Sequence, residues 1–188
     1  ERFLREVKGG PWQIIMIGGP GSGKSTYSKY ITKHFEIPHI YTGDMMRALA
    51  KENTPDGKKV KELLSKGEFA PTPIVIEAVK KRMKQPDAMK GYVFDGFPRN
   101  TEQAEAMEDK GIEYDHVINL VVSEEEVIKR LTSRGRADDK PEIIKNRIKV
   151  YHRETAPLLQ YYKDEIINIK AEGNTPEAIA KEIIKKVQ

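Results

Sequence analysis

The chain has 188 residues, a formal net charge of +4 and no cysteine. Hydrophobic residues make up 38% of it and charged residues 33%, a balance that argues against a disordered or membrane-spanning chain and for one globular domain. Acidic and basic residues are interspersed, so we expect neither a nucleic-acid nor a membrane partner. The lack of cysteine excludes a disulfide framework and a thiolate metal site, and it favours a cytoplasmic protein.

After an expected N-terminal extension, residues 1–11, short apolar runs alternate with longer segments of helical periodicity. The apolar runs predict buried strands, the second of them weak, at residues 13–17, 38–41, 92–95, 116–122 and 166–169. The helical patterns cover residues 24–35, 123–134, 139–163 and 175–187. Strands that alternate with helices predict an α/β fold, with a parallel sheet and helices on both faces.

The middle of the chain follows a different pattern. Residues 42–85 carry helical periodicity but no strand, and "TPDGKK" and "APTP" interrupt it. We therefore predict an all-helical insertion beside the sheet.

The stretch "MIGGPGSGKST" places glycines between the first predicted strand and the first predicted helix. Residues 18–25 fit the phosphate-loop pattern G-x-x-x-x-G-K-[ST] in the strand–loop–helix context that it requires. Its backbone N–H groups would converge on phosphate oxygens, at the positive end of the helix dipole. Lys24, expected to face solvent without a ligand, would reach the outer phosphates, and Ser25 or Thr26 would supply a hydroxyl toward Mg²⁺.

A second cluster lies at the end of the third predicted strand, residues 92–95, in "FDGFPRNTEQAE". Asp95 ends the strand, where a carboxylate can hold a metal-bound water near the loop phosphates. Arg99 and Gln103 are four residues apart, and together they provide a phosphate clamp and an amide able to recognise a base edge. Taken singly, each has a structural alternative: a turn or cap for Asp95, and a solvated helix face for the pair.

A third cluster, "YTGDMMR", offers Asp44 as a helix N-cap and Arg47 one turn later. Alone it is best interpreted as structural.

Arginines dominate a fourth cluster. Arg130 and Arg134 share one helix face, Arg136 follows in a loop with glycine, and Arg147 lies on the next helix. Beside a phosphate loop these residues become candidates to neutralise a transferring phosphoryl group; without it they would be surface charges balanced by nearby carboxylates.

Six segments together resemble the adenylate kinase family, in its order and over nearly the whole chain after Pro11: "GGPGSGKST", "YTGDMMRA", "KGEFAPTPIV", "DGFPRNTEQAEAM", "RGRADDKPEIIKNRIKVYHRETAPL" and "AEGNTPEAI". The resemblance implies one adenylate kinase domain, residues 12–188, around a five-stranded parallel sheet of the P-loop NTPase type. Within it, residues 42–85 would form the nucleoside-monophosphate-binding insertion, and residues 134–139 a very short lid.

The resemblance also assigns site residues. The AMP-binding positions would be Thr42, Arg47, Glu68, Phe69, Ala70, Gly96, Arg99, Gln103, Arg136 and Arg147. The ATP-binding positions would be Gly21, Ser22, Gly23, Lys24, Ser25, Thr26, Arg130, Arg134 and Gly173. Catalysis would fall to Lys24, Arg99, Arg134, Arg136 and Arg147, and Mg²⁺ to Ser25, Thr26 and, through water, Asp95.

Two features depart from the family pattern. Ser25 stands where the family usually has glycine, so Mg²⁺ coordination could shift between Ser25 and Thr26. Only Gly135 separates Arg134 from Arg136, which leaves a lid shorter than in other short-lid members. No zinc is expected, because the long zinc-bearing lid and its cysteines are missing. After the lid, Asp139 is expected to cap the next helix, with Glu142 completing a capping box.

The resemblance implies a monomeric, cytoplasmic enzyme that transfers the γ-phosphoryl group of ATP to AMP with Mg²⁺, reversibly giving two ADP. UMP/CMP kinase is an alternative, although that family typically has alanine and asparagine where this chain has Thr42 and Gln103. The alternative of another class is a non-catalytic nucleotide-binding P-loop module. Such a module would be expected to lack Lys24 or the acceptor arginines, and this chain has them all.

Overall fold

The computed structural model describes residues 12–137 and 139–188. The expected extension, residues 1–11, lies outside them, as does Asp138 within the expected lid. The described chain contains a five-stranded sheet of order β2-β3-β1-β4-β5 in which every neighbouring pair is parallel. Its strands are β1 (Trp12–Gly18), β2 (His39–Tyr41), β3 (Gly91–Asp95), β4 (His116–Val121) and β5 (Ile166–Lys170). The predicted α/β fold class, including the weak second strand, is confirmed.

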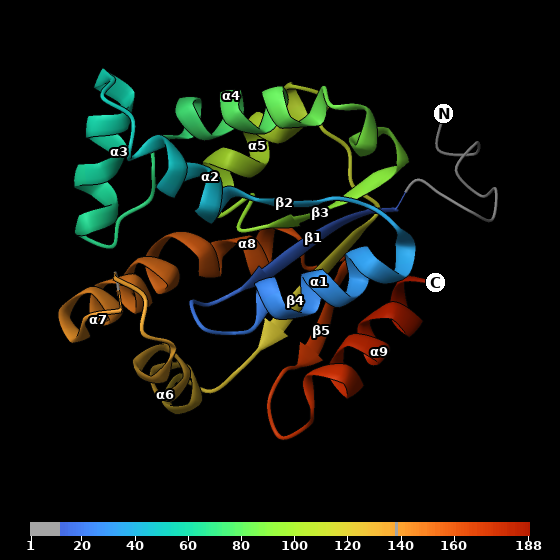
Figure 1. Cartoon of the computed structure of the whole chain (residues 1–188). Helices are drawn as coiled ribbons and strands as arrows, with labels where there is room; N and C mark the ends of the chain where they lie inside the picture. The colour runs from blue at the N-terminus through green and yellow to red at the C-terminus, as the bar shows by residue number, and fades with distance from the viewer. Residues whose placement is uncertain (1–11, 138) are drawn as a thin grey trace.

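Helices flank this sheet on both sides (Figure 1). The first half contains α1 (Lys24–Phe35), α2 (Thr42–Leu49), α3 (Pro55–Ser65), α4 (Thr72–Met83) and the 3-10 helix η2 (Pro86–Lys90). The second half contains α5 (Thr101–Asp109), α6 (Glu124–Arg134), α7 (Pro141–Val150), the π-helix η3 (Tyr151–Thr155), α8 (Ala156–Tyr161) and α9 (Pro176–Val187). Within the described residues, no helix is both long and apolar enough to cross a membrane.

The alternation of side chains along β1 explains the layers. Ile14 and Met16 belong to a core cluster with residues of α1 and α9, whereas Ile15 and Ile17 belong to a second cluster with residues of α5 and α8. Successive side chains of a strand point to opposite faces, so a strand covered on both faces is apolar throughout. The continuous run "IIMI" is therefore what a central strand of this fold requires.

Residues 42–83 form α2, α3 and α4, which lie together on the β2 side of the sheet (Figure 1). Their apolar side chains, including Met46, Val60 and Val79, join the same core cluster as Ile15. The helical segment is thus continuous with one side of the main core.

Three local predictions need correction. The expected helix over residues 139–163 is interrupted by the π-helical turn Tyr151–Thr155. Asp139 does not cap α7, because that helix begins at Pro141 with Lys140 as N-cap, and the carboxylate of Asp139 binds arginines instead. Asp44 lies within the first turn of α2 rather than at its N-cap, because β2 runs directly into α2 and leaves Tyr41 in that position.

Candidate active site

The loop of residues 18–25 connects β1 to α1. Gly21 and Gly23 have φ angles of +72° and +96°, in the left-handed region that glycine adopts without strain. A Cβ at Gly23 would lie 2.6 Å from the ring of Tyr27, so the close packing at this position also requires glycine. Gly23 is the N-cap of α1 and has no side chain to cap it. The first N–H groups of α1 can therefore bind an anion.

Lys24 folds back onto this loop. Its Nζ donates hydrogen bonds to the carbonyl oxygens of Gly18 and Gly19, at 2.6 and 2.9 Å. Burial lowers the pKa of Lys24 to about 7, against the opposing effect of the Asp95 charge. The expectation of a solvent-facing lysine is therefore wrong, because loop carbonyls provide the acceptors that water would otherwise supply. A bound phosphate would favour the charged form again.

Asp95 lies at the carboxyl end of β3, beside the loop. Its Oδ2 accepts a hydrogen bond from Ser25 Oγ at 2.7 Å and lies 2.9 Å from His39 Nε2. Burial alone would raise the pKa of Asp95, but hydrogen bonds from His39 and Ser25 and the charge of Lys24 lower it below its ordinary value. An ionised carboxylate only accepts hydrogen bonds, so His39 Nε2 carries a proton in this contact.

The other Asp95 oxygen, Oδ1, is buried and has no hydrogen-bond partner among the described residues. A buried carboxylate oxygen without a partner is costly unless a ligand binds it. Mg²⁺ takes oxygen ligands and commonly uses only one or two protein groups, with phosphate and water completing its shell. The chemistry of Asp95 and Ser25 thus fits Mg²⁺, although the described residues contain no cluster of three or more His, Cys, Asp or Glu suited to a metal.

The second polar cluster lies between β3, α2 and α5. Arg99 Nε donates to the Gly96 carbonyl at 2.8 Å, and its guanidinium lies 5.3 Å from the centre of the Phe69 ring. Thr42 Oγ1 donates to the same Gly96 carbonyl at 2.7 Å. Burial lowers the pKa of Arg99, which is nevertheless charged at any physiological pH. A half-buried guanidinium held in this way suits a phosphate or carboxylate ligand.

Gln103 supports Arg99 from α5. Its Oε1 accepts from the Arg99 backbone N–H at 2.8 Å, and its side chain is almost fully buried. Arg99 itself precedes α5, so the two residues are joined by this hydrogen bond rather than by a shared helix face.

Asp139 organises three of the arginines. Its side chain is 1% exposed, and its carboxylate accepts two hydrogen bonds from Arg134, at 2.8 and 2.6 Å. Arg147 Nη1 lies 3.4 Å from Oδ1, and the backbone N–H of Arg136 donates to Oδ2 at 3.0 Å. Burial alone would raise the pKa of Asp139, but the Arg134 and Arg136 hydrogen bonds lower it. One carboxylate thus binds cationic side chains from α6 and α7 and the backbone of the loop between them.

Arg130 lies farther back on α6, toward the loop of residues 18–25. It donates to Glu126 Oε1 at 2.9 Å and to the Ala171 carbonyl at 2.8 Å. Its Nη1 also lies 3.4 Å from the Ser22 carbonyl. These contacts hold the guanidinium against the phosphate loop.

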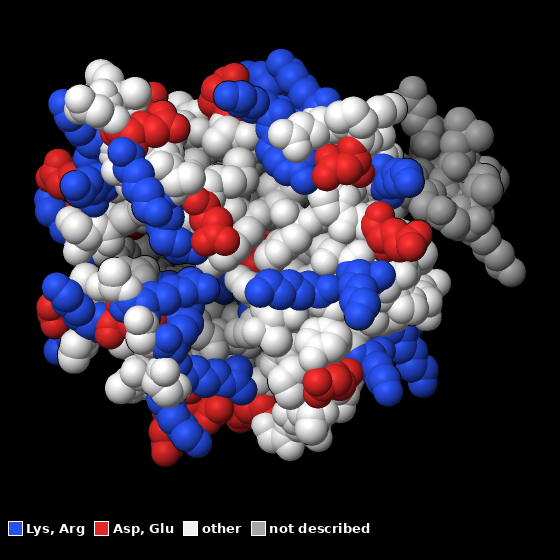
Figure 2. Space-filling view, in the orientation of Figure 1, with Lys and Arg blue, Asp and Glu red and all other residues white. Residues whose placement is uncertain are grey.

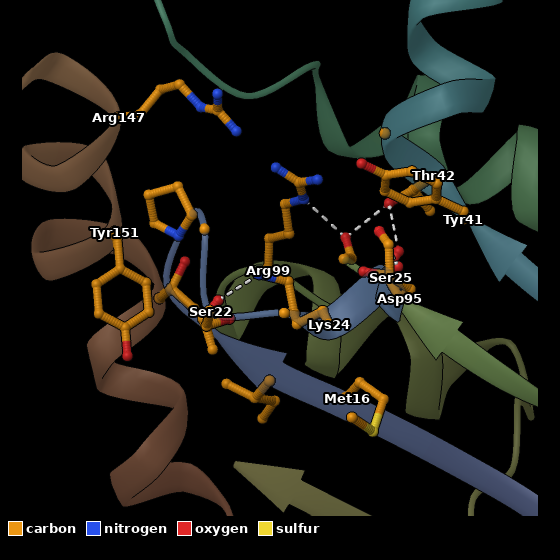
Figure 3. Close-up of a pocket in the computed structure, with 18 of the residues that line it drawn as sticks. Met16, Ser22, Lys24, Ser25, Tyr41, Thr42, Asp95, Arg99, Arg147 and Tyr151 are labelled. Carbon is orange, nitrogen blue, oxygen red and sulfur yellow. Dashed lines mark hydrogen bonds between the residues drawn. The ribbon is translucent and has the colours of Figure 1, made fainter. Parts of the chain in front are cut away.

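These clusters line one cavity of about 450 Å³. All but one of the predicted site residues line this cavity: Gly21, Ser22, Gly23, Lys24, Ser25, Thr26, Thr42, Arg47, Glu68, Phe69, Ala70, Asp95, Gly96, Arg99, Gln103, Arg130, Arg134, Arg136 and Arg147. Gly173 does not line it, although its neighbour Asn174 does. Lys and Arg side chains surround the hollow between the α3 and α7 regions (Figure 2). Inside, Arg147 and Arg99 extend into the same space from opposite sides (Figure 3).

Sequence reasoning missed three side chains here. Tyr41 and Tyr151 line the cavity, and His39 contacts Asp95. His39 and Tyr41 belong to the weakest predicted strand, where the side chains facing the site could have been identified only from the register with β3. The Tyr151 ring lies against Gly19: a Cβ added at Gly19 would be 3.7 Å from the ring.

Comparison with known proteins gives the family. A family model described as "Adenylate kinase" matches residues 16–167. The chain belongs to the adenylate kinase family. It is 42% identical to an adenylate kinase of Corynebacterium diphtheriae, over 90% of this chain and 96% of that protein. It is 41% identical to an adenylate kinase of Rhodococcus erythropolis, over 90% and 96% of the two chains. An adenylate kinase of Mycolicibacterium smegmatis is 40% identical over the same shares.

Adenylate kinases are phosphotransferases, and this chain is a member of that enzyme class. The expected family, the P-loop fold and the adenylate kinase function are confirmed by these relatives. They favour adenylate kinase over both alternatives, a UMP/CMP kinase and a non-catalytic nucleotide-binding module. The family accounts for a site with two anion-binding clusters in one cavity.

Proposed function

We propose that this enzyme transfers the γ-phosphoryl group of ATP to AMP with Mg²⁺, reversibly giving two ADP. The observation that carries the proposal is a single cavity lined by two separate clusters suited to anions, the loop around Lys24 and the pocket around Arg99. Two nucleotides bound there would point their phosphates at one another. Arg134 and Arg136 of the proposed lid line the same cavity.

The donor half of the site consists of the phosphate loop and Arg130. Residues Gly21 to Thr26 would surround the ATP phosphates with backbone N–H groups, and Lys24 would exchange its Gly18 and Gly19 carbonyls for phosphate oxygens. Arg130 reaches the Ala171 carbonyl, which lies two residues before Gly173. The proposed Gly173 backbone contact with the ATP base would therefore lie beyond Arg130, at the far end of the donor half.

The acceptor half is built around Arg99. Arg99 and Arg47 would bind the AMP phosphate, and the segment of Glu68, Phe69 and Ala70 would border its base. Gln103 uses Oε1 to accept from Arg99, so its amide NH₂ is the group left to donate to a base. Adenine presents a ring-nitrogen acceptor on its base-pairing edge, and Gln103 and Thr42 are the residues that favour it here.

Transfer needs no covalent intermediate with the protein. A phosphate oxygen of AMP attacks the γ-phosphorus of ATP, the bond to the β,γ-bridging oxygen breaks, and that oxygen keeps the electron pair as ADP leaves. Such a reaction depends on alignment and on neutralising charge at the transferring group. Lys24, Arg99, Arg134, Arg136 and Arg147 would supply that charge. Asp139 would hold Arg134 and Arg147 ready and release them to the phosphates.

Mg²⁺ would be held beside Ser25 and Thr26, with Asp95 acting through water. When bound, the ion neutralises phosphate charge and fixes phosphate geometry. The unpartnered Asp95 Oδ1 supports this assignment. Asp95 would accept hydrogen bonds from water while His39 and Ser25 keep its Oδ2 oriented.

The domain assignments are part of the same proposal. Residues 42–85 would be the AMP-binding insertion, residues 134–139 the lid, and residues 12–188 one adenylate kinase domain that works as a cytoplasmic monomer. No zinc is required by this arrangement.

The test is ADP formation from ATP and AMP, measured in both directions. We expect ADP only when both nucleotides and Mg²⁺ are present, and ATP plus AMP when ADP alone is supplied. Failure to form ADP in a folded, nucleotide-binding preparation would leave the chain a non-catalytic module.

A further inference from the structure

Tyr41 is the last residue of β2, directly beside Asp95 in the sheet. Its backbone is in register with Asp95 of β3, and its side chain lines the nucleotide cavity. The hydroxyl accepts a hydrogen bond from Arg136 Nη1 at 3.2 Å. A residue of the core sheet thus contacts the lid across the mouth of the site.

The ring of Tyr41 is fixed by its neighbours. It stacks on His39 with a centroid distance of 5.5 Å and an interplanar angle of 1°. The Arg47 guanidinium lies 5.2 Å from its centre. A Cβ at Gly43 would lie 2.6 Å from Tyr41 Cε2, so the absence of a side chain at Gly43 makes room for the ring. These neighbours hold the ring in one orientation, on the side of the cavity where Ser25 and Asp95 also lie (Figure 3).

Arg136 needs such a support. It lies between the end of α6 at Arg134 and the start of α7 at Pro141, on a loop too short to fold over a nucleotide. Its backbone N–H donates to Asp139, but this contact does not position the long side chain. Within the described chain, the guanidinium of Arg136 donates to Tyr41.

We propose that Tyr41 is a positioning residue that holds the Arg136 guanidinium over the transfer site, so that the short lid does not have to deliver it by closing. This inference rests on the proposed function, because Arg136 matters only if it neutralises charge during transfer. Misplacing a charged group by about 1 Å can cost a large part of its catalytic effect. The hydrogen bond to Tyr41 limits that displacement before substrate arrives.

The test begins with Tyr41→Phe, which keeps the stacking of the ring on His39 and the Arg47 guanidinium over its face and removes the hydroxyl. We expect kcat to fall about tenfold, with the KM values for ATP and AMP changed less than twofold and the melting temperature unchanged. Tyr30→Phe is the matched control, since Tyr30 is outside the cavity and its hydroxyl donates to the exposed Glu177. The control should keep the kcat of the unmodified enzyme.

A double-mutant cycle with Arg136→Ala shows whether Tyr41 affects kcat through Arg136 or independently of it. If Tyr41 acts by positioning Arg136, then Tyr41→Phe should have no further effect on kcat once Arg136 is alanine. Normal kcat in Tyr41→Phe, or a loss that persists in full in the Arg136→Ala background, would overturn the inference while leaving adenylate kinase activity intact. Unchanged kcat in Arg136→Ala would overturn both the inference and the catalytic role of Arg136. An unmodified chain that forms no ADP would instead contradict the proposed function itself.

Discussion

Arg134 donates two hydrogen bonds to the Asp139 carboxylate, from Nε to Oδ2 at 2.8 Å and from Nη2 to Oδ1 at 2.6 Å. Arg147 and the Arg136 backbone N–H use the same carboxylate. Without a nucleotide, Asp139 is thus the anion that keeps these cationic residues together. Phosphate groups would compete with it for the same guanidinium groups.

Replacing Asp139 with asparagine should destabilise the free enzyme. Loss of a charged, buried hydrogen-bond acceptor should lower the free energy of unfolding by about 2 kcal/mol at pH 7. The folded-state pKa of Asp139 is lowered, so its stabilising effect is full above the unfolded-state pKa, about 3.9, and is lost as pH falls through the folded-state value. Urea unfolding should therefore show a difference between the two proteins at pH 7 that shrinks toward pH 3.

The exposed Asp164 offers the control for this experiment. Asp164→Asn should change the unfolding free energy by less than about 0.5 kcal/mol. An Asp139→Asn variant as stable as the unmodified enzyme at pH 7 would mean that the carboxylate does not offset the arginine charges.

Lys24→Ala should abolish phosphoryl transfer while the protein stays folded. The lost charge at the transferring group should reduce kcat by about a hundredfold or more. Because burial lowers the pKa of Lys24 to about 7, the charged ammonium is disfavoured in the free enzyme, and the variant should be no less stable than the unmodified protein at pH 7. Steady-state kinetics and a thermal melt measure turnover and stability. Lys33→Ala, on the exposed part of α1, should change neither, and near-normal turnover in Lys24→Ala would remove this lysine from the mechanism.

Gln103→Ala and Arg99→Ala should fail in different ways. Gln103→Ala removes the amide that we propose favours adenine, so the ratio of kcat/KM for AMP to that for CMP should fall about tenfold. It should leave ATP affinity nearly unchanged. Arg99→Ala should weaken the binding of every monophosphate alike, because we propose that its guanidinium binds phosphate and not base. Equal selectivity changes in the two variants would contradict this division of roles.

The short lid should seal the donor site incompletely. Closure in this enzyme class excludes water from the transferring group, and residues 135–140 are all that separate α6 from α7. With ATP alone we expect phosphate release above that of a long-lid relative measured in parallel. Negligible release would show that the minimal lid seals as well as a long one.

The phosphate loop, the parallel sheet and the helices that carry the arginines could all be predicted because each depends on a local pattern. The role of Asp139 could not. Its spacing to Glu142 matches a capping box, but contacts with Arg134 and Arg147 decide where its carboxylate lies. Tyr41 was missed for a similar reason, since only the pairing of β2 with β3 brings it beside Asp95.

Lys24 shows the limit of motif-based reasoning. The motif indicates a phosphate ligand but gives no free-state position, and the ammonium binds the loop carbonyls when phosphate is absent. Side-chain positions that depend on tertiary contacts, or that change when a ligand binds, can be determined only from the structure.

The most direct test of the account offers ATP and Mg²⁺ to the unmodified enzyme with AMP, UMP, CMP or GMP in turn, and compares kcat/KM for diphosphate formation. We predict that AMP is preferred over each of the others by at least about a hundredfold, because a site built to hydrogen-bond one base leaves buried polar groups unpaired with another. A kcat/KM for UMP or CMP equal to or above that for AMP would contradict the assignment of the Arg99 and Gln103 pocket to adenine.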